Sequence, residues 1–454
     1  MLFCLNNLKL MQNYKQQFKG KKITIMGLGL LGRGLGYTKF LAECGADLIV
    51  TDLKTKEQLA TSLKDLKKYK NIKLVLGEHK LEDFKNRDIV IKAAGVPLDS
   101  IYIKEAKKNN IPVEMDVSLF AKCAPEVMVI GVTGTRGKSM TTTLIYEILK
   151  ANEKFLKRNV YVGGNLRGVA TLPLLKKVKA GDILVCELDS WQLQGFGEAK
   201  MSPHISVFTS FMPDHMNYYK NSMEKYFDDK ANIFKYQKVE DILIVRPDVK
   251  KLIPKNIKSK LIVVNTKEVE DWKFIVPGTH QRENLACAVE VAKQFNISLL
   301  KIKIIINNFK GVEGRLELLK NYKGIKIYND NNATTPEATI SGIEALKTDN
   351  KNIVLICGGA DKGLTLDNFV KTVNKYCKAV VLIPGTGTEK LINNYELRIK
   401  NEIGKDLKDV VKKAFKYAKK GDTILFSPAF ASFGMFNNEY ERNDLFMKII
   451  KELK

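Results

Sequence analysis

Short apolar runs rich in valine and isoleucine recur along the whole chain, and segments with helical periodicity separate them. This alternation is typical of parallel sheets that carry helices on both faces. The runs restart in three series, which begin with KITIMGLG, VMVIGVT and IKIYND. A chain of 454 residues is also long for one hydrophobic core. We therefore predict an α/β protein with three domains, at residues 1–116, 117–311 and 312–454.

The composition limits the classes of protein to consider. No apolar run reaches the roughly 18–20 residues that a membrane helix needs. The seven cysteines form no CxxC pair, which is typical of reduced thiols in a cytosolic protein. The net charge of +25 comes mostly from scattered lysines, without basic blocks interleaved with aromatic residues. We expect a cytoplasmic monomer with small-molecule partners and no nucleic-acid or membrane partner, and polyanion binding remains the alternative explanation of the charge.

The first glycine-rich loop, GLGLLG, follows the first predicted strand. Gly27, Gly29 and Gly32 have the spacing of a dinucleotide-binding loop, and Asp52 ends the next predicted strand. Such glycines let backbone N–H groups and a helix N-terminus approach a phosphate group. The loop can therefore hold the diphosphate of NAD or of a UDP-sugar. Taken alone it favours a nicotinamide enzyme, and a tight turn without any ligand is the simplest alternative.

The second glycine-rich loop, GTRGKS, lies between a predicted strand and a predicted helix. It departs from the common phosphate-loop pattern, because Val132 stands where the first glycine is expected. Gly134 and Gly137 still free the backbone to wrap N–H groups around phosphate oxygens. Lys138 supplies a positive charge, and Ser139 offers a hydroxyl to Mg²⁺. We predict that this loop binds a nucleoside triphosphate.

Two other predicted strands of the central series end in groups that can bind a metal. Glu187 ends the run DILVCE, and Asp214 and His215 follow the run HISVFTS. In parallel sheets, ligands bind outside the carboxyl ends of the strands. These groups should therefore lie at the same edge as Lys138 and Ser139, which predicts a metal–nucleotide site there.

A series of motifs that covers nearly the whole chain resembles the Mur ligases, the ATP-dependent amide-forming enzymes of peptidoglycan precursor synthesis. The motifs are GTRGKS, GGNLRG, ELDSWQL, DHMNYY, GTHQRENLACAV, GRLELL, YNDNNATTPEAT, GGADKG and SPAFASFGMF. The resemblance implies a Rossmann-like N-terminal domain for the UDP-linked substrate, a central P-loop ATPase-like sheet for ATP, and a Rossmann-like C-terminal domain for the amino acid. GLGLLG, ELDSWQL and SPAFAS are most similar to family members that add D-glutamate to UDP-N-acetylmuramoyl-L-alanine through an acyl phosphate.

The resemblance also implies a role for individual residues. The residues expected to bind ATP are Gly134, Thr135, Arg136, Gly137, Lys138, Ser139, Asn284, Arg315 and Asp330. Those expected to bind the UDP-linked substrate are Gly29, Leu30, Leu31, Asp52 and Asn165. Those expected to bind the amino acid are Thr334, Lys362 and Ser432. Those expected to bind two Mg²⁺ ions are Ser139, Glu187, His215 and Lys230. The expected catalytic residues are Lys138, Glu187, His215 and Lys230.

Lys230 enters this set as a lysine carbamylated by CO₂, a modification that the resemblance implies. An ammonium group would be repelled by Mg²⁺, whereas a carbamate is an anionic oxygen ligand that suits this hard cation. Without the family match, one lysine in so lysine-rich a chain would not be singled out.

Three positions depart from the family pattern, and the third leaves the identity of the amino acid open. Asn332 stands where lysine is frequent, Gln281 stands where asparagine is usual, and Glu439 stands where an aromatic residue often lines the amino-acid pocket. A family ligase for a different amino acid is therefore one alternative. An NAD-dependent oxidoreductase built on GLGLLG and Asp52 is the alternative from another enzyme class, but it gives Glu187 and His215 no role. A non-catalytic basic binding protein is a third.

Overall fold

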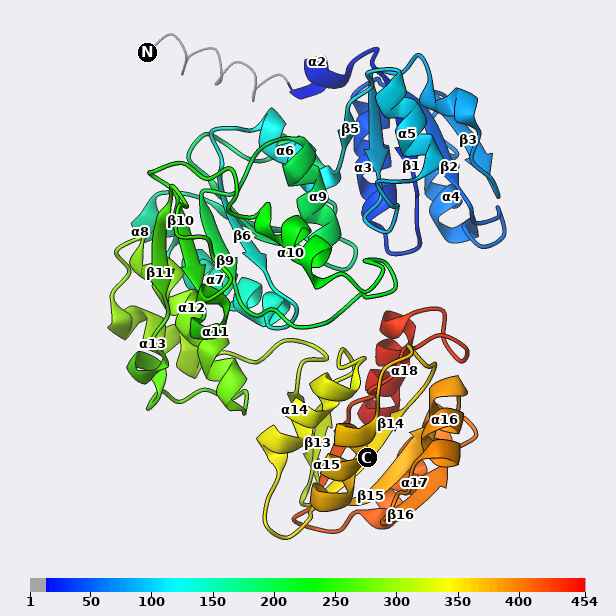
Figure 1. Cartoon of the computed structure of the whole chain (residues 1–454), viewed down its shortest axis with the longest axis vertical. Coiled ribbons are helices and arrows are strands. Elements are labelled where there is room, and N and C mark those ends of the chain that lie inside the picture. The colour runs from blue at the N-terminus through cyan, green and yellow to red at the C-terminus, as the bar shows by residue number, and fades with distance from the viewer. Residues whose placement is uncertain (1–13, 454) are drawn as a thin grey trace. The chain divides into compact units, whose positions relative to one another are not determined.

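The computed structural model describes residues 14–453 and contains two compact units (Figure 1). The first unit comprises the chain up to residue 268 together with residues 283–305, and the second comprises residues 269–282 and the chain from residue 306. Cys4 lies outside the described residues. Within residues 14–453, no helix has both the length and the apolar character needed to cross a membrane.

The first unit begins with a five-stranded parallel sheet in the order β3-β2-β1-β4-β5. Its strands are β1 (Lys22–Met26), β2 (Asp47–Asp52), β3 (Ile72–Leu76), β4 (Ile89–Lys92) and β5 (Val113–Glu114). Its helices are α2 (Tyr14–Phe18), α3 (Arg33–Glu43), α4 (Ala60–Leu66) and α5 (Ile101–Lys108). The strand order reverses beside β1, so the loop after β1 lies at the position where such sheets bind nucleotides.

The same unit contains a six-stranded parallel sheet in the order β11-β10-β9-β6-β8-β7. Its strands are β6 (Met128–Thr133), β7 (Val160–Gly164), β8 (Ile183–Glu187), β9 (Ile205–Phe208), β10 (Ile242–Val245) and β11 (Lys260–Val263). The helices of this part of the chain are α6 (Asp116–Cys123), α7 (Lys138–Ala151), α8 (Glu153–Leu156), α9 (Ser190–Glu198), α10 (Met223–Ala231), α11 (Pro247–Lys250), α12 (Thr279–Lys293) and α13 (Leu299–Asn307). Strand β6 lies between β8 and β9, so the carboxyl ends of these three strands are neighbours.

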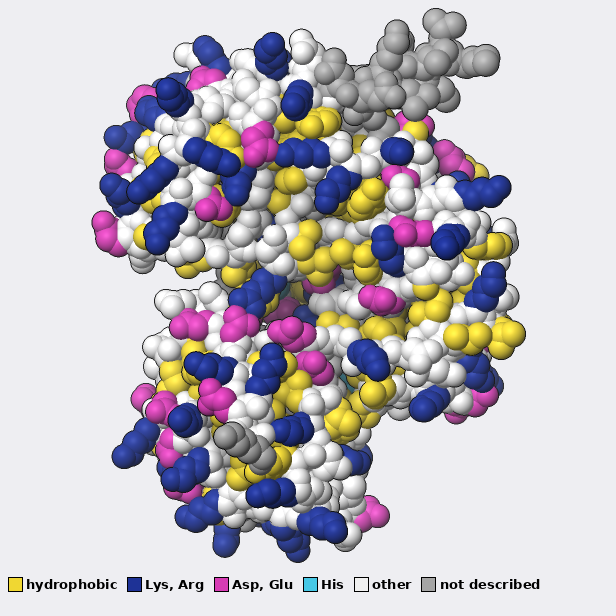
Figure 2. Space-filling view, turned by 180° about the vertical axis from the view of Figure 1, so that it is seen from behind, with side chains coloured by type: hydrophobic (Ala, Val, Ile, Leu, Met, Phe, Trp, Pro, Cys, Tyr) yellow, Lys and Arg dark blue, Asp and Glu magenta, His cyan; other side chains and the backbone are white. Residues whose placement is uncertain are grey.

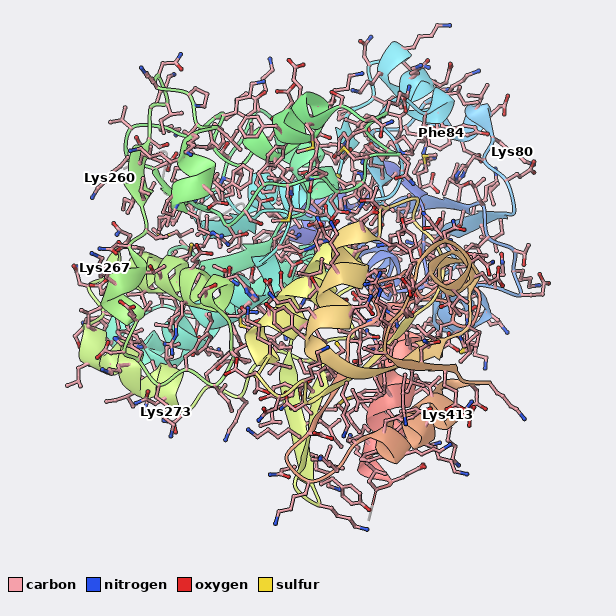
Figure 3. The ribbon with its side chains drawn as sticks, turned by 60° about the horizontal axis from the view of Figure 1, so that its bottom comes forward. Lys80, Phe84, Lys260, Lys267, Lys273 and Lys413 are labelled. Carbon is pink, nitrogen blue, oxygen red and sulfur yellow. The ribbon has the colours of Figure 1, made fainter. Side chains whose placement is uncertain are left out.

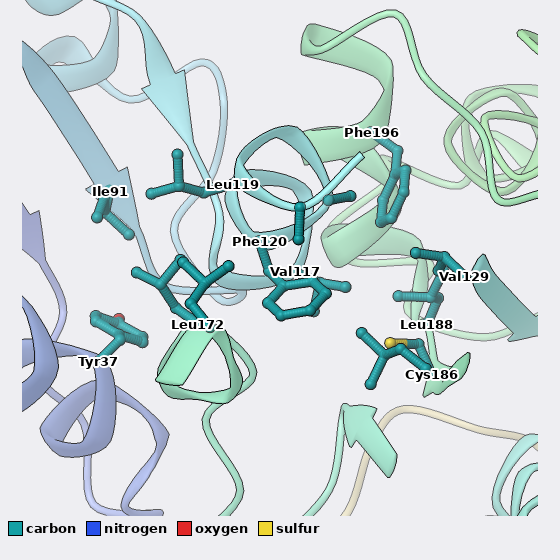
Figure 4. Packing of buried hydrophobic residues seen from close by; sticks show 14 of the residues in the cluster. Tyr37, Ile91, Val117, Leu119, Phe120, Val129, Leu172, Cys186, Leu188 and Phe196 are labelled. Carbon is teal, nitrogen blue, oxygen red and sulfur yellow. The ribbon is translucent and has the colours of Figure 1, made fainter. Parts of the chain in front are cut away.

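One continuous hydrophobic cluster joins the two sheets of the first unit. The cluster includes Tyr37 and Ile91 from the first sheet's layer, Phe120 of α6 and Leu188 after β8 (Figure 4). Burying this apolar surface stabilises the contact between the sheets. This shared cluster explains why the first 268 residues form one compact unit, and the division at residues 116 and 117 remains a prediction.

The second unit is built on a six-stranded sheet in the order β12-β13-β17-β14-β15-β16. Its strands are β12 (Glu317–Tyr322), β13 (Ile325–Asn329), β14 (Ile353–Gly358), β15 (Cys377–Ile383), β16 (Lys400–Ile403) and β17 (Thr423–Phe426). Its helices are α14 (Pro336–Leu346), α15 (Asp367–Tyr376), α16 (Thr386–Asn394), α17 (Leu407–Tyr417) and α18 (Glu439–Lys451). All pairs are parallel except β12 with β13. The predicted α/β class is confirmed.

On the face shown in Figure 2, the basic side chains are spread out rather than gathered in one place. Figure 2 shows lysine and arginine mixed with acidic and apolar groups across one face. In Figure 3, Lys80, Lys260 and Lys273 lie at the outside of the molecule, whereas Phe84 is fully buried. Exposed charges of this kind contribute little to stability, and they explain the large net charge without a dedicated basic patch on the face in Figure 2.

Candidate active site

The loop GTRGKS connects β6 to α7 and requires glycine at two positions. Gly134 and Gly137 have φ angles of 146° and 88°. A Cβ on Gly134 would lie 2.1 Å from Oγ1 of Thr209, and a Cβ on Gly137 would lie 2.3 Å from Oδ1 of Asn284. Only glycine fits there, and the predicted ATP-binding residue Asn284 therefore lies directly against the loop.

Residues just after β9 hold the loop in shape. The Thr135 N–H donates to the Ser210 carbonyl (2.8 Å), and the Arg136 N–H donates to the Ser210 hydroxyl (2.8 Å). The Thr209 hydroxyl donates to the Arg136 carbonyl (2.5 Å). We did not single out Thr209 and Ser210 in the sequence, although their place directly after a strand of the same sheet edge was a usable signal.

Two lysines converge on one carbonyl group of the loop. The Lys138 Nζ donates to the carbonyls of Gly134 (3.0 Å) and Thr135 (3.2 Å), and the Lys230 Nζ donates to that of Gly134 (2.9 Å). Lys230 is only 1% exposed. Burial, together with the positive charge of Lys138, lowers the pKa of Lys230 well below its usual value. This environment therefore disfavours the charged ammonium of Lys230 relative to that of an exposed lysine.

Glu187 ends β8 with a buried carboxylate that is only partly satisfied. Its Oε2 has no hydrogen-bond partner among residues 14–453, and its Oε1 lies 3.5 Å from Nδ2 of Asn165. A buried charged oxygen without a partner is costly, so a cation is the natural complement. The neighbouring Asp189 has another role, because its side chain caps α9 by accepting the Gln192 N–H (2.7 Å).

His215 lies in an aromatic setting after β9. Its ring centroid is 4.6 Å from that of Trp191, and its Nε2 is 3.8 Å from the Asp214 carboxylate. Asp214 also pairs with Arg136 (3.0 Å) and so links His215 to the phosphate loop. Burial lowers the pKa of His215 despite the opposing charge of Asp214. The neutral imidazole is favoured, and it can offer a nitrogen lone pair to a ligand.

The loop GLGLLG is stabilised by an acid and adjoins a segment of the central sheet. Both oxygens of Asp52 accept backbone N–H groups, from Gly29 (2.9 Å) and Lys54 (2.9 Å). The Gly168 N–H donates to the Leu31 carbonyl (3.0 Å), so this loop adjoins the segment that carries Asn165. The predicted substrate residues are thus brought near one another, and Leu30, which lies between Gly29 and Leu31, is 45% exposed.

The second unit brings its own predicted residues together at the carboxyl ends of neighbouring strands. The Lys362 Nζ donates to the Thr334 hydroxyl (3.1 Å). Ala360 and Ala431 exchange backbone hydrogen bonds, which places the loop of Lys362 beside Ser432. A separate pair of contacts holds the predicted nucleotide-binding acid, because Asp330 accepts from the Ser427 hydroxyl (2.9 Å) and the Leu316 N–H (3.1 Å). Leu316 follows Arg315 directly, so these two predicted residues belong to adjoining segments.

Arg442 of α18 is a buried residue that our sequence analysis missed. It is fully buried and donates to the side chain (2.8 Å) and carbonyl (3.0 Å) of Asn331, and to the Phe430 carbonyl (3.4 Å). Burial lowers its pKa to about 10. Arg442 thus ties together the loops of Thr334 and Ser432. Its place on the apolar face of a helix, four residues before the buried Phe446, was the only signal in the sequence.

The parts of the chain that match known families span almost the same residues as the three sheets. Residues 21–114 match the Mur ligase MurD-like N-terminal domain, residues 132–307 the Mur ligase middle domain, and residues 314–430 the Mur ligase glutamate ligase domain.

Individual relatives agree with this match. The UDP-N-acetylmuramoylalanine–D-glutamate ligase of Borreliella burgdorferi is 36% identical over 96% of this chain and 99% of that protein. The ligase of the same name from Clostridioides difficile is 34% identical over the same shares. The crystal structure of UDP-N-acetylmuramate–alanine ligase from Thermotoga maritima has a TM-score of 0.61 at 19% identity, covers 96% of this chain and 100% of that one, and shows the shared fold. The chain belongs to the Mur ligase family.

Proposed function

We infer that the protein is an ATP-dependent ligase that adds D-glutamate to UDP-N-acetylmuramoyl-L-alanine in peptidoglycan precursor synthesis. The relatives that match almost the full chain at 34–36% identity carry this activity in their names. The observation in the structure that best supports it is the contact between Asn165 and Glu187 (3.5 Å). It links the segment beside GLGLLG to the edge of the sheet that carries the phosphate loop.

In this proposal, the central phosphate loop binds the β- and γ-phosphates of ATP. The N–H groups of the loop would surround the phosphate oxygens, and Lys138 would exchange its bonds with loop carbonyls for bonds to phosphate. Asn284 would lie beside the nucleotide, because it already contacts Gly137. Arg315 and Asp330 are proposed as the nucleotide-binding residues of the second unit.

The residues at this edge fit a divalent cation. The unpartnered Oε2 of Glu187 and the neutral imidazole of His215 are suitable donors, and Ser139 stands at the first turn of α7. No group of three or more His, Cys, Asp or Glu within residues 14–453 forms a metal site by itself. We propose that Ser139, Glu187, His215 and a carbamylated Lys230 hold two Mg²⁺ ions, which would offset the negative charges of the reacting groups.

The state of Lys230 supports carbamylation. Its lowered pKa favours the neutral amine, which is the form that attacks CO₂. The new N–C bond forms as one proton leaves the nitrogen, and an anionic carbamate results. This change would replace a donor that now bonds the Gly134 carbonyl with oxygens that can accept.

The reaction then needs two displacements. An oxygen of the L-alanine carboxylate attacks the γ-phosphorus, and the bond from phosphorus to the ADP oxygen breaks. The amine of D-glutamate next attacks the acyl carbon of this acyl phosphate, phosphate leaves, and the nitrogen loses a proton. Lys138 and the loop N–H groups stabilise the transferring phosphoryl group, which carries the charge that would otherwise repel the carboxylate.

We propose that Thr334, Lys362 and Ser432 bind the amino acid. Lys362 would pair with the side-chain carboxylate of D-glutamate through a charge-assisted hydrogen bond. Glu439, which stands at a family position that is often aromatic, begins α18, and its carbonyl accepts from the Asn331 side chain (2.9 Å). This contact involves the backbone of Glu439 and does not depend on its side chain.

Phosphate release from ATP with UDP-N-acetylmuramoyl-L-alanine tests the function against a panel of D- and L-amino acids. We expect turnover with D-glutamate and less than about 1% of that rate with the others, because a missing or misplaced charge leaves buried polar groups unpaired. Faster turnover with another amino acid would replace D-glutamate in the proposal. Tight binding of NADH without binding of the UDP-linked substrate would favour the oxidoreductase instead.

A further inference from the structure

Lys92 is a buried lysine that the proposed chemistry does not use. It ends β4 and is 2% exposed. Its Nζ donates to two neutral oxygens, the Val96 carbonyl (3.0 Å) and Oε1 of Gln194 (3.1 Å). Burial lowers its pKa to about 8, although the charges of Asp189 and Asp229 oppose this shift. A buried cation with neutral partners is costly, so its presence calls for a role other than stability.

One end of this contact holds a turn against the loop GLGLLG. Val96 belongs to the turn that follows β4, and the Val96 N–H donates to the Ala93 carbonyl (3.1 Å). The Ala93 N–H donates to the Met26 carbonyl at the end of β1 (2.8 Å). A Cβ on Gly27 would lie 2.8 Å from Cβ of Ala93. Lys92 therefore fixes a turn that packs directly on the proposed UDP-substrate loop.

The other end leads to the segments that carry His215 and Lys230. Gln194, which is 4% exposed, lies in α9 and donates through Nε2 to Oδ2 of Asp229 (2.8 Å) and to the Tyr218 hydroxyl (2.9 Å). Asp229 directly precedes Lys230 in α10, and Tyr218 follows His215 by three residues. The amide oxygen and both amide N–H groups of Gln194 are thus used. A buried amide whose donors and acceptor all have partners has one orientation, so Gln194 holds its partners in fixed positions.

We propose that Lys92 and Gln194 form a positioning link between the two sheets of the first unit, which holds the substrate carboxylate in line with the γ-phosphate of ATP. This role rests on the proposed function. The link connects the turn beside GLGLLG to the two segments that deliver His215 and Lys230. Neither residue needs to touch a substrate, because a small displacement of the reacting groups is enough to slow an in-line attack.

The test uses the full-length protein with Lys92→Met, Gln194→Leu and the double variant. Methionine is unbranched like lysine and one atom shorter, and it removes the hydrogen-bond donors. We expect each single variant to lower kcat by roughly tenfold or more, with the KM for ATP changed by less than about twofold. The double variant should be no slower than the slower single variant, because both substitutions break the same link.

Lys107→Met is the matched control. Lys107 of α5 also bridges to α9, through Glu198 (2.9 Å), but this pair is exposed. We expect its kcat to stay within about twofold of the wild type. Binding of one ATP per chain verifies that each variant is folded. If Lys92→Met does not fold, Gln194→Leu carries the test, since Lys92 can keep its bond to Val96.

The outcomes separate the two proposals. Wild-type protein without D-glutamate-dependent ADP release would remove the proposed function. With an active wild type, the positioning role is rejected if both folded single variants keep kcat within twofold, or if their effects multiply in the double variant. It is also rejected if Lys107→Met is as slow as Lys92→Met, because the loss of any contact between these segments would then explain the lower kcat.

Discussion

The two glycine-rich loops of the first unit share a strand–loop–helix setting but differ in their charged partners. The loop GLGLLG is stabilised by the carboxylate of Asp52, which accepts the Gly29 N–H. The loop GTRGKS instead has Lys138 and Lys230, whose amines both donate to the Gly134 carbonyl. Lys92 also lies near the first loop, but its amine donates to Val96 and Gln194.

This difference follows from what each loop is proposed to do. A diphosphate that only has to be held is served by backbone N–H groups and a helix N-terminus. A phosphoryl group in transfer needs cationic groups where charge develops in the transition state. Charge changes at GTRGKS should therefore affect kcat, and changes at GLGLLG should affect binding of the UDP-linked substrate.

The largest effect is expected for Lys138→Ala. Loss of this amine should lower kcat on the order of 10³-fold, because the transferring phosphoryl group would lose the positive charge that we propose Lys138 supplies. Steady-state ADP release measures the effect. Lys150→Ala is the control, since Lys150 lies on the same helix and pairs with Glu153 at the surface (2.8 Å). Activity within tenfold of the wild type for Lys138→Ala would break the distinction between the loops.

Lys230→Ala should have the next largest effect, a loss of kcat of roughly 10²-fold or more, because the proposed carbamate ligand cannot form. Acetate or formate should restore part of the activity by supplying a carboxylate in its place. Lys225→Ala, an exposed position of the same helix, is the control. A ¹³C-labelled carbamate signal in the wild-type protein and its absence in Lys230→Ala would support the modification directly. Full activity of Lys230→Ala without added acid would remove the carbamate from the proposal.

Motifs within one short segment were readily predicted from the sequence. Gly134, Gly137 and Lys138 are constrained by local backbone geometry, and Glu187 and His215 by their position at strand ends, so their common location follows from parallel-sheet topology. The link of Lys92 with Gln194 could not be predicted, because it joins residues 102 positions apart. No local pattern specifies such a partner.

The same limit applies to the second unit. Strand β12 was missed because it is a polar edge strand, with the pattern ELLKNY rather than an apolar run. It pairs antiparallel with β13, as edge strands of largely parallel sheets sometimes do. Arg442 was missed because its partners, Asn331 and the Phe430 carbonyl, lie in loops distant in sequence. In each case the missing information was the partner, which only the fold supplies.

A smaller effect is expected at the first loop. Asp52→Ala should raise the KM for UDP-N-acetylmuramoyl-L-alanine roughly tenfold, the equivalent of about 1.4 kcal/mol, because the N–H groups of Gly29 and Lys54 lose their acceptor. Its kcat should stay within about twofold, since the loop has no part in the proposed phosphoryl transfer. Asp47→Ala, at the exposed start of the same strand, is the control. A fall in kcat with unchanged KM would contradict the division of roles.

The smallest expected effect is on the free energy of unfolding, and it concerns the buried amine of Lys92. Folding lowers the pKa of Lys92 to about 8, so between pH 8 and its unfolded value near 10.5 the unfolded chain binds a proton that the native protein has lost. More protons bound in the unfolded state mean that stability rises with pH in this window. The groups that act on Lys92 are Asp189 and Glu198 of the α9 segment, Asp229 of α10 and Lys107 of α5.

The stability of the wild type relative to Lys92→Met should therefore increase by about 1 kcal/mol between pH 7 and pH 9, because methionine has no proton to lose. Urea unfolding followed by tryptophan fluorescence at the two pH values measures this difference, and Trp191 of α9 reports on the first unit. Lys64→Met, at an exposed position of α4, serves as the reference for the loss of a surface lysine. A pH-independent difference for Lys92→Met would mean that the Lys92 amine is already solvated in the native protein. The contrast between a buried lysine that only positions other groups and the two lysines that are proposed to serve the chemistry, Lys138 and Lys230, would then lose its physical basis.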